Sequence, residues 1–500
     1  MDHIRDTGMK ILLVCPECPE TFWSFKHALR IISRKALLPP LGLLTVAAML
    51  PPSWRKKLVD LGVEPLRDED IRWADYVFVS AMRIHKESVD KIVARCRRLG
   101  ARIVAGGPLF TAGYEHAREI DHLVLDEAEI TLPAFLKDLG EGHPQPVYTA
   151  HQRADLKDTP IPLWDLVNMK KYACMPIQHS RGCPFCCDFC DVTRLFGNRM
   201  RVKATDQILA ELESLYVRGW RDSVFVVDDN FIGNKKELKE EVLPAMIGWM
   251  ERRNHPFVLS TQASINLSDD EELMRLMVRA GFDTVFVGIE TPDDRCLAEC
   301  HKSQNRNRDL AASVRKMQSF GLQVQAGFIL GFDSDTPSIF TSLAHFIQES
   351  GIVTAMVGLL NAPVGTKLYE RLMKENRLIQ RATGDNTDLS MNFVPRMSYE
   401  ELIAGYRWVV RRIYSHQLFY ERVIAFLKSY KPVQTGRFRR HSYDVWALLK
   451  SMWFLGIRSR GRIYYWKLLL WSLFRRPQLF SLAITLAVQG FHFRKVFAGC

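Results

Sequence analysis

The 500-residue sequence is poor in cysteine, with eleven in all, which is far below the density of a disulfide-stapled scaffold. It has no apolar stretch near its start, where Met1 is followed by Asp-His-Ile-Arg-Asp-Thr-Gly, so no secretory signal is expected. The strongest membrane candidate, Pro477 to Phe493, has only 17 residues and includes glutamines and a histidine, so we expect it to be buried or interfacial rather than membrane-spanning. With 47% hydrophobic and 25% charged residues, the composition is that of a globular protein. Because cysteine is sparse, we expect the protein in the reducing cytoplasm.

The positive net charge of +12 is confined to the end of the chain. Residues 431–500 contain 13 lysines and arginines and one acid, Asp444, whereas the rest of the chain has 55 basic and 55 acidic residues. A negatively charged partner, if the protein has one, is therefore expected to bind this C-terminal region. We do not expect nucleic acid there, because bases need aromatic rings on an open polar groove and residues 479–488 are almost wholly apolar.

The first 150 residues alternate short apolar runs with helix-length segments, which predicts an α/β, Rossmann-like domain with a doubly wound parallel sheet. The expected strands are residues 10–15, 76–80, 102–105 and 122–125, with a helix over 88–99. Gly106-Gly107-Pro108 follows a strand directly, where a turn without side chains lets a ligand approach; a simple turn is the alternative. No Gly-x-Gly-x-x-Gly follows the first strand, so a dinucleotide is not favoured.

A second β/α series follows a proline-containing linker, residues 151–172. Its expected strands are 223–227, 257–261, 284–288, 323–330 and 354–359, with helices over 204–218, 269–280 and 307–320. Five strands with crossover helices predict a partial (β/α) barrel over residues 173–397, with ligands at the carboxyl ends of its strands. Residues 398–500 are expected to form a helical extension.

Four cysteines lie between Cys183 and Cys190. Cys183 and Cys186, with Cys187 and Cys190, form two Cys-x-x-Cys pairs that zinc could bind, but a zinc site usually takes its two pairs from separated stretches. The other spacing, Cys183-x3-Cys187-x2-Cys190, offers three thiolates for three irons of a [4Fe–4S] cluster. The fourth iron would then be open to a ligand, and we favour this interpretation.

This loop resembles that of the radical S-adenosylmethionine (SAM) enzymes. The resemblance implies that Cys183, Cys187 and Cys190 hold the cluster and that the amino and carboxylate groups of SAM bind the open iron. It also places the ring of Phe189 near the adenine and leaves Cys186 with a packing role.

Further motifs of that family follow in order. Asp228 and Asp229 end a strand where the family has Gly-Gly-Glu, which receives the SAM amino group, and Glu290 ends another strand. Gly327-Phe-Ile-Leu-Gly331 resembles a strand that lies against adenine, with Asp333 and Asp335 after it. For each carboxylate the alternative is a helix cap or a loop acid, and for His179 we favour packing over a ligand role.

The N-terminal half narrows the resemblance to the cobalamin-binding radical SAM enzymes, over roughly residues 9–400. It is carried by three motifs: Pro39-Pro40-Leu41-Gly42-Leu43, Gly106-Gly107-Pro108 and Asp126-Glu127-Ala128-Glu129. The resemblance implies that Gly106, Gly107 and Pro108 contact cobalamin. The Asp-x-His-x-x-Gly motif of methyltransferase-type domains is absent after the first strand, which leaves His85 as a distant alternative ligand.

Residues 401–500 resemble the helical extension of one branch, which includes the hopanoid C-2 methylases. Apart from the resemblance, residues 464–476 interleave large apolar rings with cations, as helices at a bilayer interface do. The region is expected either to touch the inner face of the membrane peripherally or to cap the barrel.

Together these resemblances imply a radical SAM C-methyltransferase that uses a [4Fe–4S] cluster, SAM and cobalamin on an unactivated carbon of a lipid or polycyclic isoprenoid. An external electron donor of flavodoxin or ferredoxin type is implied as partner, and no catalytic side chain is assigned. The alternatives are oxidation, cyclisation or rearrangement with the same cofactors, or a non-catalytic cobalamin or iron–sulfur sensor.

Overall fold

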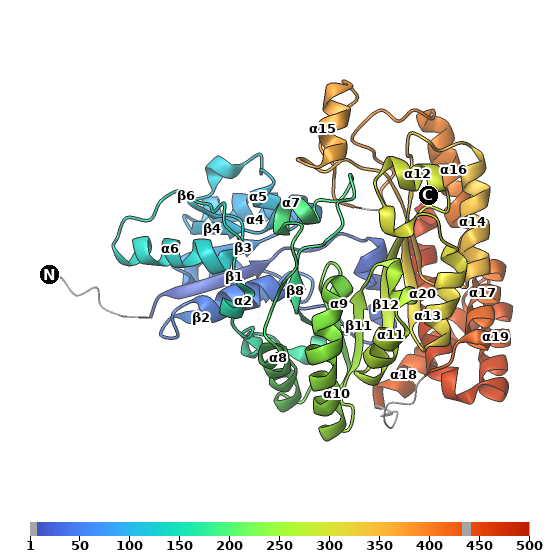
Figure 1. The fold of residues 1–500 in the computed structure, drawn as a ribbon. Coiled ribbons are helices and arrows are strands. Elements are labelled where there is room, and N and C mark those ends of the chain that lie inside the picture. The colour runs from blue at the N-terminus through green and yellow to red at the C-terminus, as the bar shows by residue number, and fades with distance from the viewer. Residues whose placement is uncertain (1–7, 386, 433–441, 500) are drawn as a thin grey trace.

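The computed structural model describes residues 8–385, 387–432 and 442–499. It contains two six-stranded parallel sheets, a two-stranded hairpin that falls in sequence between the first two strands of the second sheet, and a set of C-terminal helices. The first sheet occupies one end of the molecule and the C-terminal helices the other, with the second sheet between them (Figure 1). This confirms the α/β class with parallel sheets and a helical C-terminal region.

The first sheet has the strand order β2-β1-β3-β4-β5-β6. Its strands are β1 Lys10–Cys15, β2 Arg55–Asp60, β3 Tyr76–Ser80, β4 Arg102–Gly106, β5 His122–Val124 and β6 Val147–Tyr148. Four of the six were predicted. β2 was missed because it begins Arg-Lys-Lys, and only its last three residues are buried.

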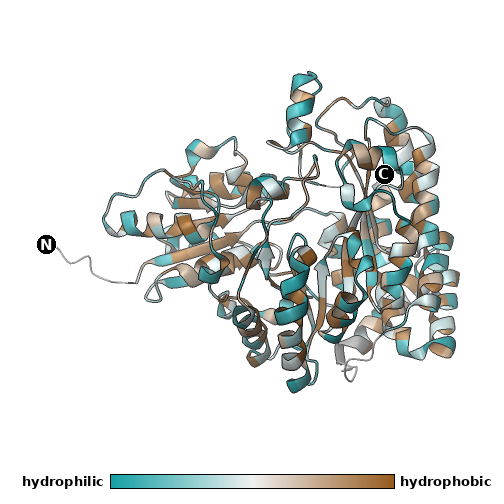
Figure 2. Ribbon diagram, in the orientation of Figure 1, coloured by the Kyte–Doolittle hydropathy of each residue, from teal (hydrophilic) through white to brown (hydrophobic). Residues whose placement is uncertain are grey.

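Helices cover both faces of this sheet, as strands that are apolar at nearly every position require. Ile11 and Leu13 pack with α2 and α6, whereas Leu12 and Val14 pack with α3 and α4. These helices are α2 Leu41–Met49, α3 Asp68–Trp73, α4 Lys86–Arg98 and α6 Ala128–Gly140. Figure 2 shows both hydrophilic and hydrophobic residues along the helices around this sheet.

The second sheet has the order β14-β13-β12-β11-β10-β7, with every neighbouring pair parallel. Its strands are β7 Met175–Ile177, β10 Ser223–Val226, β11 Val258–Gln262, β12 Phe282–Glu290, β13 Gln323–Leu330 and β14 Ala355–Leu359. Helices between the strands include α8 Thr205–Val217, α10 Leu243–Arg252, α11 Glu271–Arg279, α13 Leu310–Ser319 and α14 Ser338–Ser350. The three-residue β7 is the strand that the sequence did not predict. The boundaries at residues 150, 172 and 397 remain proposals.

The C-terminal region is helical. It comprises α16 Tyr399–Ile413, α17 His416–Ser429, α18 Ser442–Ser451, the π-helix η11 Met452–Ile457, α19 Arg462–Arg475 and α20 Phe480–Val496. The apolar run 477–493 lies mostly in α20 and is largely buried: Phe493 stacks on Phe22 of the N-terminal segment, with ring centroids 4.2 Å apart. Within the described part of the chain, no helix combines the length and apolarity needed to cross a membrane.

A buried ion-pair network joins the first domain to the hairpin of β8 Ser180–Arg181 and β9 Arg201–Val202. Arg181 donates to Glu127 at 3.0 Å and to Glu129 at 2.7 Å, and Arg201 donates to Glu127 at 2.9 Å. The glutamates stand just before and in the first turn of α6, and their side chains are only 3% and 4% exposed. Because these buried charges need partners, the first domain and the hairpin are held in one fixed relation.

We predict that Glu129→Gln lowers the free energy of unfolding. Burial opposes ionisation of Glu129, but the hydrogen bond and charge of Arg181 outweigh it and lower the pKa from 4.5 to about 2. The ion pair therefore stabilises the fold above pH 4.5 and loses its effect as the pH falls towards 2. At neutral pH the lowered pKa corresponds to about 3 kcal/mol of the free energy of unfolding.

Denaturant unfolding at several pH values would measure this. The deficit of Glu129→Gln should be largest at neutral pH and shrink in acid, whereas the exposed Glu141→Gln should follow the wild type throughout. A deficit that does not change with pH would show that the carboxylate charge is not responsible.

Candidate functional site

The cysteine loop is carried between the two strands of the β8–β9 hairpin. Gly182 begins it with a φ of +98°, and a Cβ there would lie 2.7 Å from the carbonyl oxygen of Arg199, so only glycine fits the turn. Farther along, the amide of Asp188 donates to the carbonyl of Cys300 at 3.1 Å and its carbonyl accepts from Leu368 at 2.9 Å. The loop is thus fastened to segments that follow β12 and β14.

The four cysteines differ in exposure. Cys187 is buried, Cys183 and Cys190 are half-buried, and Cys186 is exposed. Among the residues that the structure describes, no three histidine, cysteine, aspartate or glutamate side chains converge closely enough to share a single metal ion.

The three predicted ligands are electrostatically coupled. Burial raises the pKa of Cys183, Cys187 and Cys190, that of Cys190 to about 12, and the charge of Cys187 adds to the increase for the other two. Lys302 opposes the increase at all three. Buried sulfurs of this kind become thiolates when a positive centre lies among them, and an iron–sulfur cluster supplies one.

Lys302 is a site residue that the sequence analysis missed. Its ammonium lies 2.6 Å from Glu290 and 6.0 Å from the ring centroid of Phe189, and the side chains of Lys302 and Glu290 are only 12% and 8% exposed. Burial acts against the charged amine, yet Glu290 and Cys187 outweigh it, so the pKa of Lys302 is raised. A lone lysine twelve residues beyond the strand carries no motif, so only the fold could identify it.

The backbone at the end of β12 is strained where it presents Glu290. This residue has a φ of +65°, and the pairing with β13 shifts register there. Asn305 holds the strand end by donating to the carbonyls of Gly288 at 3.0 Å and Ile289 at 2.9 Å. A Cβ at Gly288 would lie 2.4 Å from the Glu290 carboxylate, so a side chain there would displace that carboxylate from its present position.

The adjacent aspartates after β10 have different environments. Asp228 is fully buried and accepts from the amide of His179 at 2.8 Å and the hydroxyl of Ser180 at 2.5 Å, so it anchors the start of the hairpin. Asp229 is half-buried; burial, then the charge of Asp228, raises its pKa to about 7, while the amide of Gly182 opposes the increase. Of the two, Asp229 is better suited to an incoming cation. His179 is buried against Phe231, as the packing interpretation predicted.

Asp333 and Asp335, which follow β13, form ion pairs and hydrogen bonds that hold their own loop in place. Asp333 accepts from Arg371 at 2.8 Å and Arg377 at 2.6 Å, and Asp335 accepts from the amides of Gly331 at 2.7 Å and Phe332 at 3.0 Å. These contacts support the alternative of loop acids. Gly327, on β13, is closely packed: a Cβ there would lie 3.0 Å from the ring of Phe286, so a side chain would crowd that ring.

The Gly106-Gly107-Pro108 turn lies at the carboxyl end of β4, where the neighbouring strands leave no room for side chains. A Cβ on Gly106 would lie 2.5 Å from the carbonyl oxygen of Val124, and Gly107, with a φ of +91°, would clash with Ser80 at 2.8 Å. Strand packing explains both glycines, so a contact with cobalamin remains a prediction.

The lone pair of the neutral His85 ring already accepts a hydrogen bond, so it is not free to bind a metal. Burial lowers its pKa to about 4, so the ring is neutral at pH 7. The amide of Met82 donates to Nδ1 at 3.2 Å, which leaves the ring proton on Nε2. Without a change of tautomer, neither nitrogen offers a free lone pair.

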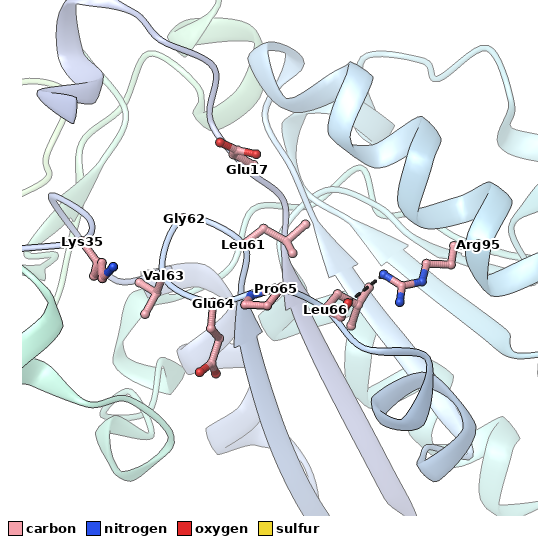
Figure 3. A pocket seen from close by; sticks show the side chains of 9 residues that line it. All are labelled: Glu17, Lys35, Leu61, Gly62, Val63, Glu64, Pro65, Leu66 and Arg95. Carbon is pink, nitrogen blue, oxygen red and sulfur yellow. Dashed lines mark hydrogen bonds between the residues drawn. The ribbon is translucent and has the colours of Figure 1, made fainter. Parts of the chain in front are cut away.

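One surface hollow lies beside the first sheet, after β1 and β2 (Figure 3). It is lined by Glu17, Lys35, Leu61, Gly62, Val63, Glu64, Pro65, Leu66 and Arg95, and Arg95 donates to the carbonyl of Leu66 at 2.7 Å. None of the predicted cofactor residues lines it, so we assign it no part in the chemistry.

A bridge of apolar side chains joins the two sheets. Trp23 follows β1, and its indole N–H points to the sulfur of Met356 on β14 at 2.9 Å, while its ring meets Phe286 on β12 edge to face with centroids 5.2 Å apart. Gly327 lies between the side chains of Phe286 and Met356, which a Cβ on this glycine would approach to 3.0 and 3.6 Å. The loop beyond the carboxyl end of β1 therefore contacts the same face of the second sheet as Gly327.

Comparison with known families matches three successive segments. Residues 28–136 match the B12 binding domain, residues 177–347 match the radical SAM superfamily, and residues 366–500 match a domain of unknown function.

Two long relatives span nearly the whole chain. An uncharacterised methyltransferase of Synechocystis sp. is 38% identical and covers 97% of this chain and 91% of its own. The hopanoid C-2 methylase of Rhodopseudomonas palustris is 32% identical and covers 94% and 90%.

Solved structures agree in fold. The radical SAM methyltransferase TsrM of Kitasatospora setae, with cobalamin and a [4Fe–4S] cluster bound, aligns at a TM-score of 0.59 and 14% identity over 97% of this chain and 99% of that one. The cobalamin-dependent SAM radical enzyme OxsB, with aqua-cobalamin bound, aligns at 0.63 and 12% identity over 99% and 80%. At these identities the alignments show similarity of fold alone.

Serine substitutions should separate the four cysteines. We expect Cys183→Ser, Cys187→Ser and Cys190→Ser each to lose the cluster, while Cys186→Ser keeps about four irons per chain, because its side chain is exposed. Iron and sulfide analysis with visible absorption after anaerobic reconstitution would measure this. Loss of iron in Cys186→Ser, with retention in one of the others, would reverse the assignment.

The two aspartates should respond differently to amidation. Asp228→Asn removes an acceptor from two buried donors and should cost about 1–3 kcal/mol of stability. Asp229→Asn should leave stability unchanged or higher, because its carboxylate is disfavoured by burial, and should weaken SAM binding about tenfold. Thermal melts and calorimetric SAM titration would distinguish them, and equal effects on SAM binding with no stability difference would contradict the division.

Proposed function

The chain belongs to the cobalamin-dependent radical SAM methyltransferases, and from that premise we propose that it methylates an unactivated carbon of a polycyclic isoprenoid lipid. The family carries with it the [4Fe–4S] cluster, SAM and cobalamin that the sequence analysis predicted. The 32% identity to a hopanoid C-2 methylase, over 90% of that enzyme, supports a hopanoid-like substrate.

The observation that carries the substrate class is the apolar bridge of Trp23, Phe286 and Met356. It lies against Gly327, on the strand that we propose contacts the adenine of SAM, and it begins in the loop after β1 of the cobalamin domain. A substrate that must meet both cofactors would thus lie among large apolar side chains. Such surroundings favour a hydrocarbon over a charged metabolite.

When bound, the cluster and SAM supply a radical that can remove hydrogen from an unactivated carbon, and cobalamin supplies the methyl group. We propose that Cys183, Cys187 and Cys190 each hold one iron and leave the fourth open to SAM. The hairpin network of Arg181 and Arg201 keeps that loop at a fixed distance from the first domain. The main contribution of the protein is then placement of the reacting groups.

The remaining residues would orient SAM. Asp229 would accept its amino group, for which a partly buried carboxylate with a raised pKa is suited. Phe189 and the glycines at 327 and 331 would accommodate the adenine. Glu290, locked by Lys302 at 2.6 Å, would face the cofactor from the end of β12. Gly106, Gly107 and Pro108 would support cobalamin at the edge of the first sheet.

The reaction class needs a small-molecule substrate and an external electron donor. We propose a flavodoxin or ferredoxin for the donor. Because the proposed substrate is a lipid, we also propose that the enzyme meets it by peripheral contact with the inner face of the membrane, through the C-terminal region.

Anaerobic incubation of the reconstituted enzyme with SAM, a reductant and candidate triterpenoid lipids tests the proposal. We expect 5′-deoxyadenosine, S-adenosylhomocysteine and a product heavier by one methylene unit. Deoxyadenosine without methylated lipid, across hopanoids and related isoprenoids, would contradict the substrate class and favour oxidation, cyclisation or rearrangement.

Trp23→Ala provides the matched variant. It should still cleave SAM but should yield several-fold less methylated product per deoxyadenosine, because the apolar bridge that positions the substrate is shortened. The exposed Trp408→Ala should behave as the wild type.

A further inference from the structure

The outer faces of α18, η11 and α19 carry large apolar side chains in contact with solvent. Of the twenty strongly exposed large hydrophobic residues in the described ranges, ten lie between residues 445 and 474. They are Val445, Trp446, Leu449, Trp453 and Ile457 on α18 and η11, and Ile463, Trp466, Leu470, Leu473 and Phe474 on α19. We refer to these ten residues as the apolar face.

The spacing shows that the exposure is systematic. On each helix the exposed residues recur every three or four positions, so they form one stripe along its outside. The opposite side is packed in the core, where Leu455, Tyr465 and Leu468 are 0 to 2% exposed. These helices are therefore apolar on two sides. A surface helix that packs on a core and otherwise faces water needs only one apolar side.

The two stripes are joined. Trp466 of α19 packs against Gly456 of η11 and donates its indole N–H to that residue's carbonyl at 3.0 Å. α19 lies on the side of the molecule away from the first sheet (Figure 1), and no predicted cofactor residue is near α18, η11 or α19 in sequence.

Cations flank this face, and η11 and α19 contain no acidic residue. Arg458, Arg460, Arg462, Lys467 and Arg475 are all exposed. No aspartate or glutamate follows Asp444 in the sequence. Aromatic and aliphatic side chains flanked by lysine and arginine match the boundary between acyl chains and anionic headgroups.

We propose that the apolar face docks the enzyme on the surface of an anionic lipid bilayer, with the rings of Trp446, Trp453 and Phe474 at the level of the headgroups. α20 takes no part in this docking, because many of its apolar residues are buried. The inference deepens the proposed function, because a bilayer is where a polycyclic lipid substrate is found. Docking itself requires neither SAM nor substrate.

Co-sedimentation of the full-length protein with vesicles tests docking apart from catalysis, in the absence of SAM and reductant. We expect binding to vesicles that contain phosphatidylglycerol, and weaker binding to pure phosphatidylcholine or at high salt. The double variant Ile463→Asp/Phe474→Asp, at positions 74% and 77% exposed, should bind about tenfold more weakly without loss of stability. Val217→Asp, at a position 65% exposed on α8, is the matched control and should bind as the wild type.

Other outcomes would overturn the proposal. Equal vesicle binding by wild type and the double variant would exclude the apolar face as the docking surface. Concentration-dependent dimerisation that the double variant abolishes, without vesicle binding by the wild type, would assign the face to a second copy of the chain. Methylation of lipid presented in detergent should be unchanged in the double variant. A failed docking test therefore leaves the proposed methylation reaction standing, and a failed lipid assay leaves docking standing.

Discussion

The structure depends on the buried pairing of two glutamates at the start of α6 with two arginines on the β8–β9 hairpin. Glu127 and Glu129 belong to the first domain, and Arg181 and Arg201 flank the cysteine loop in sequence. Four charges withdrawn from water are tolerated only in a well-satisfied geometry. A reaction that passes between two cofactors held by different domains requires such a fixed relation, since small displacements of reacting groups cost large factors in rate.

The site is built around backbone constraints as much as around side chains. Gly182 begins the cysteine loop in a conformation reserved for glycine, and Glu290 ends β12 in a strained one held by Asn305. Asp228 ties the hairpin to the end of β10 from within the core. These three devices bring the thiolates, Asp229 and the Glu290–Lys302 pair into electrostatic contact without any of them being adjacent in sequence.

Much of this was predictable from the sequence. The long apolar strands, the alternation of strands and helices and the cysteine spacing are local patterns, and they gave the class, the family and the cofactors. Local patterns failed where the signal was short or masked by charge, as in β2 with its Arg-Lys-Lys start and in the three-residue β7. They could not distinguish Asp228 from Asp229, because the difference is burial under another element. Lys302, Trp23 and the partners of Glu127 and Glu129 act across long sequence separations, so only the folded chain reveals them.

The central claim is that three thiolates leave one iron of the cluster open to the amino and carboxylate groups of SAM. Electron–nuclear double resonance on the reduced, reconstituted enzyme, with SAM isotopically labelled at its amino nitrogen, tests this directly. The account predicts a hyperfine coupling between that nitrogen and the cluster that is retained in Cys186→Ser. A cluster with four cysteine ligands and no coupling to the label would contradict it.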